Sequence, residues 1–91
     1  MNNTETFDIN AAKGENDGEV YLQWDSIKGT ERYVVQKAGH ASKKVWKHVD
    51  IVTVSRCVIE GLKSGKEYLF RVAAVKRNGQ NIWSNQIRKK L

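Results

Sequence analysis

Hydrophobic and polar residues alternate along most of the chain, which is the pattern of β-strands that bury one face. The cleanest alternation spans 19–25, where Val20, Leu22 and Trp24 fall on one face and polar residues on the other. No window of twelve or more residues combines apolar positions at helical spacing with a preceding capping residue. The pattern therefore predicts strands and no helix.

Seven segments carry this alternation, and glycine-containing or polar turns separate most of them. The predicted strands are 4–12, 19–25, 32–37, 44–49, 56–62, 68–75 and 82–91. Each strand offers one apolar face, so a second sheet has to cover it. The sequence therefore predicts an all-β fold, a seven-stranded antiparallel β-sandwich of the immunoglobulin-like kind.

Three groups of residues within these strands resemble the signature of a known family. They are Trp24 in the second strand, Tyr33-x-Val35 in the third, and Leu62-x-x-Gly65-x-x-Tyr68-x-Phe70-x-Val72 at the sixth. Together they resemble a fibronectin type III domain over about residues 7–87. We expect a structural core that includes Trp24, Tyr33, Val35, Leu62, Tyr68, Phe70 and Val72. The resemblance also implies that the Tyr68 hydroxyl bonds a backbone group at the preceding corner.

The chain length allows one small domain, which we assign to residues 6–91, with residues 1–5 as a flexible tail. Two positions depart from the family pattern. Ser64 stands where the corner proline usually is, and Lys89 stands where an inward apolar residue is expected. We therefore expect the last strand to fray after Ile87.

Charge is distributed unevenly along the sequence. Residues 5–31 contain seven acidic and two basic side chains, whereas residues 32–91 contain fourteen basic and three acidic ones. In the implied topology the basic side chains gather on the larger sheet, where they suit a polyanion. The residues predicted for such binding are Lys37, Lys43, Lys44, Arg71 and Arg88. The alternative is a solvated surface whose edge lysines block strand addition.

The residue types that carry catalysis or bind metals form no recognisable constellation. Cys57, at an inward strand position, is interpreted as a small buried hydrophobe. His40 and His48 lack a third dependable ligand and the spacing of a zinc site. No carboxylate pair shares an apolar face, and no glycine-rich phosphate loop is present. We therefore predict no enzyme activity, no metal and no cofactor.

Two tryptophans outside the predicted core remain open to two interpretations. Trp46 and Trp83 either cover an edge of the sandwich or lie exposed and stack on sugar rings. The direction in which Trp46 faces is ambiguous from the sequence.

We expect a non-catalytic spacer or protein-interaction and adhesion module of a larger multidomain extracellular or cell-surface protein. Its partners would be neighbouring domains or another protein, and the isolated domain would be a monomer. The alternative is a polyanion-binding module for an acidic polysaccharide or nucleic acid, using the basic sheet. No apolar run approaches the roughly 20 residues of a membrane helix, so we predict no membrane insertion.

Overall fold

The computed structural model of the protein describes residues 6–39 and 45–91, and every regular element in these ranges is a β-strand. The strands are β1 (Ile9–Lys13), β2 (Val20–Trp24), β3 (Thr30–Gly39), β4 (Lys47–Val52), β5 (Arg56–Ile59), β6 (Glu67–Lys76), β7 (Asn81–Trp83) and β8 (Ile87–Lys90). The prediction of an all-β fold is confirmed. The predicted tail at 1–5 and the predicted start of the fourth strand at Lys44 lie outside the described residues.

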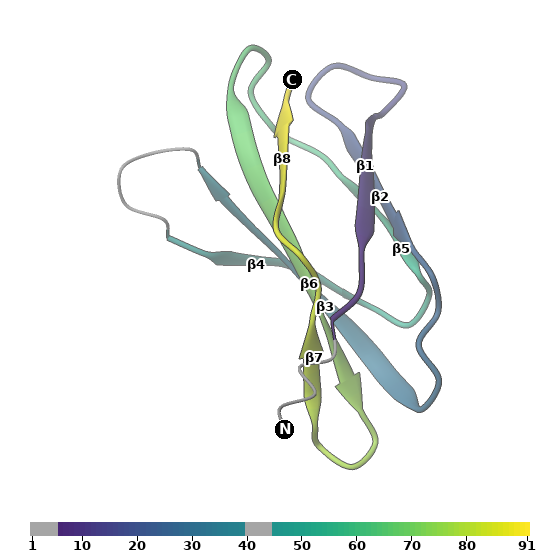
Figure 1. The fold of residues 1–91 in the computed structure, drawn as a ribbon. Coiled ribbons are helices and arrows are strands. Elements are labelled where there is room, and N and C mark those ends of the chain that lie inside the picture. The colour runs from purple at the N-terminus through teal and green to yellow at the C-terminus, as the bar shows by residue number, and fades with distance from the viewer. Residues whose placement is uncertain (1–5, 40–44) are drawn as a thin grey trace.

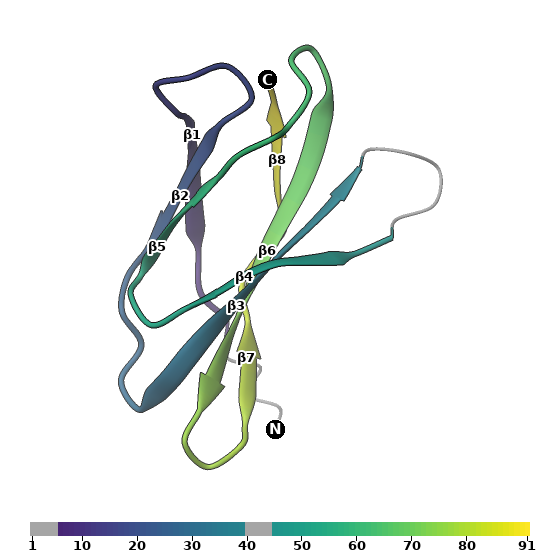
Figure 2. The same ribbon diagram turned by 180° about the vertical axis from the view of Figure 1, so that it is seen from behind.

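The strands form two antiparallel sheets packed face to face (Figure 1). The small sheet has the order β1-β2-β5, and the large sheet has the order β4-β3-β6-β7, with β8 also paired to β6. Seen from behind, the chain crosses from β4 in the large sheet to β5 in the small one (Figure 2). The topology is that of the predicted immunoglobulin-like sandwich.

The structure has eight strands where the sequence predicts seven, because the predicted strand 82–91 is divided into β7 and β8. Both pair with β6, but their registers differ by one residue, as at a β-bulge. The break lies at Ser84, whose side-chain Oγ accepts a hydrogen bond from the Val72 amide at 2.8 Å. The Ser84 amide in turn donates to the Val72 carbonyl at 2.8 Å. These two bonds keep the chain attached to β6 while the ladder shifts.

The expectation that the last strand frays after Ile87 is wrong. Lys89 and Lys90 stay paired with β6, and the Leu91 amide donates to the Lys66 carbonyl at 3.0 Å. Ladder bonds involve only the backbone, so a lysine at an inward position does not interrupt them. Lys89 is half-buried, and a lysine stem can cover apolar surface while its ammonium stays in water.

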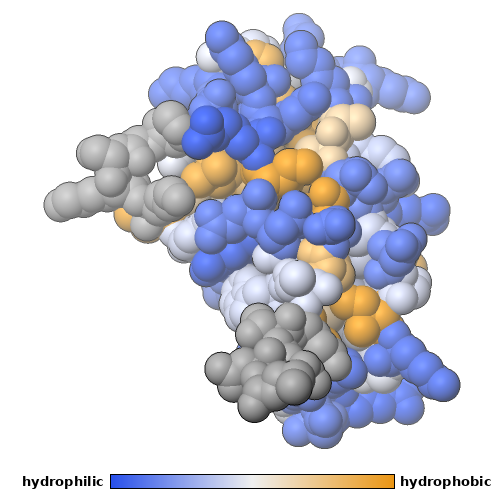
Figure 3. Space-filling view, viewed as in Figure 1, coloured by the Kyte–Doolittle hydropathy of each residue, from blue (hydrophilic) through white to orange (hydrophobic). Residues whose placement is uncertain are grey.

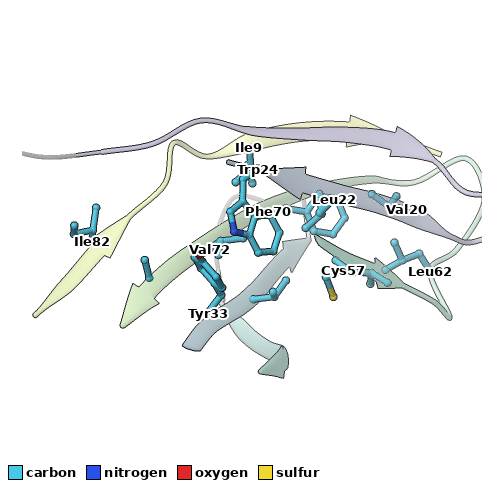
Figure 4. Close-up of a cluster of buried hydrophobic side chains, with 13 residues drawn as sticks. Ile9, Val20, Leu22, Trp24, Tyr33, Cys57, Leu62, Phe70, Val72 and Ile82 are labelled. Atoms are coloured by element: carbon cyan, nitrogen blue, oxygen red, sulfur yellow. The ribbon is translucent and has the colours of Figure 1, made fainter. Parts of the chain in front are cut away.

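The core lies between the sheets and is centred on aromatic and branched side chains (Figure 4). Trp24 of β2 meets Tyr33 of β3 edge-on, with ring centroids 5.3 Å apart and an interplanar angle of 64°. Phe70, from the middle of β6, is fully buried beside them. Six of the expected core residues are buried: Trp24, Tyr33, Val35, Leu62, Phe70 and Val72. Tyr68 is half-buried at the rim.

The position of Tyr68 follows from the corner before β6. Its hydroxyl oxygen accepts a hydrogen bond from the Lys63 amide at 3.0 Å, and its ring lies tilted against Phe70 at 6.3 Å. The side chain thus joins the corner backbone to the end of the core, as the resemblance implied.

Replacing Tyr68 with phenylalanine should lower the free energy of unfolding by about 1 kcal/mol, because the Lys63 amide loses its acceptor while the ring remains. Urea denaturation measures the difference. Tyr21→Phe is the matched control, since the Tyr21 hydroxyl has no hydrogen-bond partner among the described residues. Equal stability of the wild type and the Tyr68→Phe variant would contradict the role of the corner bond.

Candidate functional site

The outer face of the large sheet carries a stack of two indole rings on one guanidinium. Arg71 points outward from β6 because its neighbours Phe70 and Val72 point into the core. Its guanidinium carbon lies 4.1 Å from the ring centroid of Trp46 and 4.4 Å from that of Trp83. Register places Trp83 of β7 opposite Ala73, whereas Trp46 lies just before β4. Three separate segments therefore converge on one cation.

A buried glutamine on the neighbouring strand β3 hydrogen-bonds the guanidinium of Arg71. Gln36 lies opposite Arg71 in the β3–β6 ladder, and its Oε1 accepts a hydrogen bond from the Arg71 Nε at 2.7 Å. The Gln36 Nε2 lies 3.4 Å from the Nδ1 of His48, which is opposite it on β4. Although Gln36 is on the outer face, only 8% of its surface is exposed. Partial burial lowers the pKa of the Arg71 guanidinium through desolvation.

In this arrangement two aromatic rings hold one guanidinium by cation–π contacts. Each indole presents a π-face to the cation, an interaction worth about 0.5–2 kcal/mol. The cluster offers neither a nucleophile nor an acid–base pair to a reacting group. Arg71 occupies one face of each ring. The rest of the two side chains stays partly accessible, because Trp83 is 39% exposed and Trp46 is half-buried. Both tryptophans therefore cover part of the outer face of the large sheet. Their contact with Arg71 was not predicted from the sequence.

The residues predicted to bind a polyanion fall at different places. Arg71 and Arg88 lie on the outer face of the large sheet, and Arg88 Nε is 3.4 Å from the Oε1 of Glu67. Lys37 lies opposite the core residue Phe70, so register puts it on the inner face at the end of β3. Lys43 and Lys44, like His40, lie outside the described residues.

Cys57 lies on the inner face of β5, opposite Leu22, and is buried. Burial raises the pKa of its thiol to about 11, and the carboxylate of Asp50 adds to the increase. A buried thiol with this pKa stays protonated at neutral pH and makes a poor nucleophile. Within residues 6–39 and 45–91, no three His, Cys, Asp or Glu residues are grouped to hold a metal ion.

The Cys57 pKa predicts a stability change at high pH. The folded state keeps its proton to about pH 11, whereas an unfolded thiol loses it near pH 9. Stability from this group is therefore complete below pH 9 and falls as the pH rises toward 11. Urea denaturation of the wild type and Cys57→Ala over this range isolates the effect. Parallel pH profiles for the two proteins would contradict the burial of an ionisable thiol.

A family model for the fibronectin type III domain matches residues 7–90. The chain belongs to this family. Fibronectin type III domains are generally non-catalytic modules. In the described part of the chain, no helix has the length and apolar character to span a membrane.

Sequence and structural comparisons show that this fibronectin type III domain is similar to modules of larger proteins. It is 52% identical over 42 residues to a titin homolog of Caenorhabditis elegans, a match covering 46% of this chain and 0% of that protein. The twitchin kinase region of C. elegans has 25% identity and a TM-score of 0.64, over 85% of this chain and 14% of that one. The chain spans only a small part of both relatives.

Another structural neighbour matches the domain along nearly its whole length. The Fn3-like protein of Clostridium thermocellum has a TM-score of 0.77 and 20% identity, over 98% of each chain. At this identity the likeness concerns the fold.

The space-filling view shows hydrophilic residues over most of one side of the domain, with hydrophobic residues emerging in small patches (Figure 3).

Proposed function

We propose that this fibronectin type III domain is a non-catalytic spacer between neighbouring domains of a larger multidomain protein. The observation that carries the proposal is where the two ends of the described chain attach: the first lies beside β7, which pairs with the later half of β6, and the last follows β8, which pairs with the earlier half (Figure 1). At one end, the Thr6 Oγ1 donates to the Trp83 carbonyl at 2.8 Å. At the other, the Leu91 carbonyl accepts from the Gly65 amide at 2.6 Å. Both ends are thus tied to the sandwich, at opposite halves of β6.

The shape and the relatives support the same role. The domain measures 40 × 28 × 17 Å, and a chain that enters and leaves at opposite halves of β6 holds its neighbours apart. The titin homolog and the twitchin kinase region each contain a similar module as a small fraction of a long chain.

Spin-label distances test the spacer role. We expect nitroxides at Asp8→Cys and Lys90→Cys, two exposed positions that leave the bonds of Thr6 and Leu91 in place, to give one narrow distance distribution that does not change with salt, while buried Cys57 stays unlabelled. The control pair is Asp8→Cys with Asn81→Cys, which lies near the same end and should give a shorter distance. A broad distribution for the terminal pair, or one as short as the control, would contradict a rigid spacer.

The proposal includes an extracellular or cell-surface parent protein, with adhesion or protein contact as its task. This part rests on the sequence resemblance. Antibody staining of intact cells that express the parent protein tests the location. Surface staining supports it, and staining that requires permeabilised cells contradicts it.

A second candidate function is the binding of a polyanion. It is supported by the net charge of +6 and by Arg71, which has no carboxylate partner among the described residues. Retention on a heparin resin should fall steeply with salt, and Arg71→Gln with Arg88→Gln should shorten it. Lys13→Gln with Lys28→Gln removes the same charge away from the large sheet and serves as control. Equal effects of the two double variants would contradict a site on this face.

A further inference from the structure

The outer face of the small sheet, on the side of the molecule opposite Arg71, carries two rows of side chains. Register fixes the rows across β1, β2 and β5: one is Asn10–Gln23–Arg56 and the next is Ala12–Tyr21–Val58. The first row consists of two amides and a guanidinium, and the second is apolar around an aromatic ring. A polar row therefore runs directly beside an aromatic one.

These rows border a depression of about 550 Å³, which is the size of a small-molecule site. Its polar lining includes Asp8, Asn10, Gln23, Asp25 and Arg56, with Tyr21 at its side. None of these six side chains forms a hydrogen bond or ion pair with another residue in the described ranges. Their donors and acceptors are consequently available to a ligand.

The charges that line the depression favour a neutral ligand. Arg56 lies opposite Gln23 in the ladder, with Asp8 and Asp25 around the same depression. A polyanion would meet two carboxylates, and a basic peptide would meet the guanidinium. A hydroxyl group both donates and accepts, so a neutral polyol can use all three charged groups and both amides.

Tyr21 supplies the surface that a sugar ring needs. It is half-buried between Ala12 and Val58, and 53% of Val58 is exposed. A second depression, of about 530 Å³, is also lined by Tyr21 and Arg56, so the two adjoin across the sheet. A ligand that fills both depressions must therefore be longer than one sugar ring.

We propose that the outer face of β1, β2 and β5 binds a neutral oligosaccharide. Tyr21 packs against the C–H face of a sugar ring, while Asn10, Gln23 and Arg56 hydrogen-bond its hydroxyls. This activity is independent of the spacer role and uses the opposite face from the proposed polyanion site.

The test is an array of neutral glycans, followed by affinity electrophoresis in gels that contain the soluble polysaccharides of the positive classes. We expect binding to at least one class. Gln23→Ala and Arg56→Ala should each weaken it about tenfold, a loss equivalent to one or two hydrogen bonds. Both side chains are exposed, so these variants should fold normally. Tyr21→Phe keeps the ring and should retain binding.

Ile51→Ala is the control. Ile51 lies on the large sheet, is 60% exposed and is not part of the proposed binding face on β1, β2 and β5. It should bind as the wild type does. The proposal is overturned if no neutral glycan binds, or if Gln23→Ala and Arg56→Ala leave the binding unchanged. Binding of poly-lysine alone, abolished by Asp8→Asn with Asp25→Asn, would instead assign the face to a basic protein and also overturn it.

Discussion

Replacing Phe70 with alanine is expected to lower the free energy of unfolding by about 3–5 kcal/mol. Phe70 has 0% exposed surface and lies at the centre of the core, so the shortened side chain leaves a cavity that rigid sheets on both sides cannot fill. For a small domain this is a large part of a total stability of about 5–15 kcal/mol. Urea denaturation followed by tryptophan fluorescence measures the loss.

Ile51→Ala is the control for this experiment as well. Ile51 lies on the same sheet but is largely exposed, and its truncation should change stability by less than about 0.5 kcal/mol. A Phe70→Ala variant that lost less than about 1 kcal/mol would show that the side chain is not enclosed between two sheets.

Replacing Gly18 with alanine should cost about 3 kcal/mol or more, for two separate reasons. Gly18 has φ +78°, a conformation that residues with a side chain rarely adopt. A methyl group there would also collide with the carbonyl oxygen of Leu62. The backbone of Leu62 cannot retreat freely, because its amide donates to the Gly18 carbonyl at 3.0 Å.

Gly61→Ala separates the two contributions. Gly61 has a similar φ of +76°, but a methyl group there meets no atom within 4 Å. It should therefore cost only the conformational strain, about 1–2 kcal/mol. Equal losses in the two variants, measured by urea denaturation, would contradict the close approach of the β1–β2 turn to Leu62.

The alternation of side chains was sufficient to predict most of the fold. In β2 and β5 the predicted inward residues are buried, because a strand in a two-layer structure has one face in the core. The division of the last strand could not be predicted in this way. It depends on hydrogen bonds between Ser84 and Val72, and these partners are set by the pairing of β6 with its neighbours.

The candidate site was only partly predictable for a similar reason. Arg71 and the two tryptophans were each identified as surface candidates, but their stacking requires the register of β6 with β7 and the approach of the segment before β4. The burial of Gln36 was missed, because the alternation identifies its face but not what covers that face. The rows on the small sheet also arise from register, which joins residues far apart in sequence.

Mechanical unfolding of a tandem array of this domain tests the central claim most directly, which is that one cooperative sandwich stands in series between its neighbours. Residues 7–90, extended at roughly 3.5 Å per residue and less the folded length of 40 Å, give a contour-length gain of roughly 250 Å per domain. Single-molecule force spectroscopy should show one such step for each domain. Smaller gains in several steps, or extension without a force peak, would contradict it.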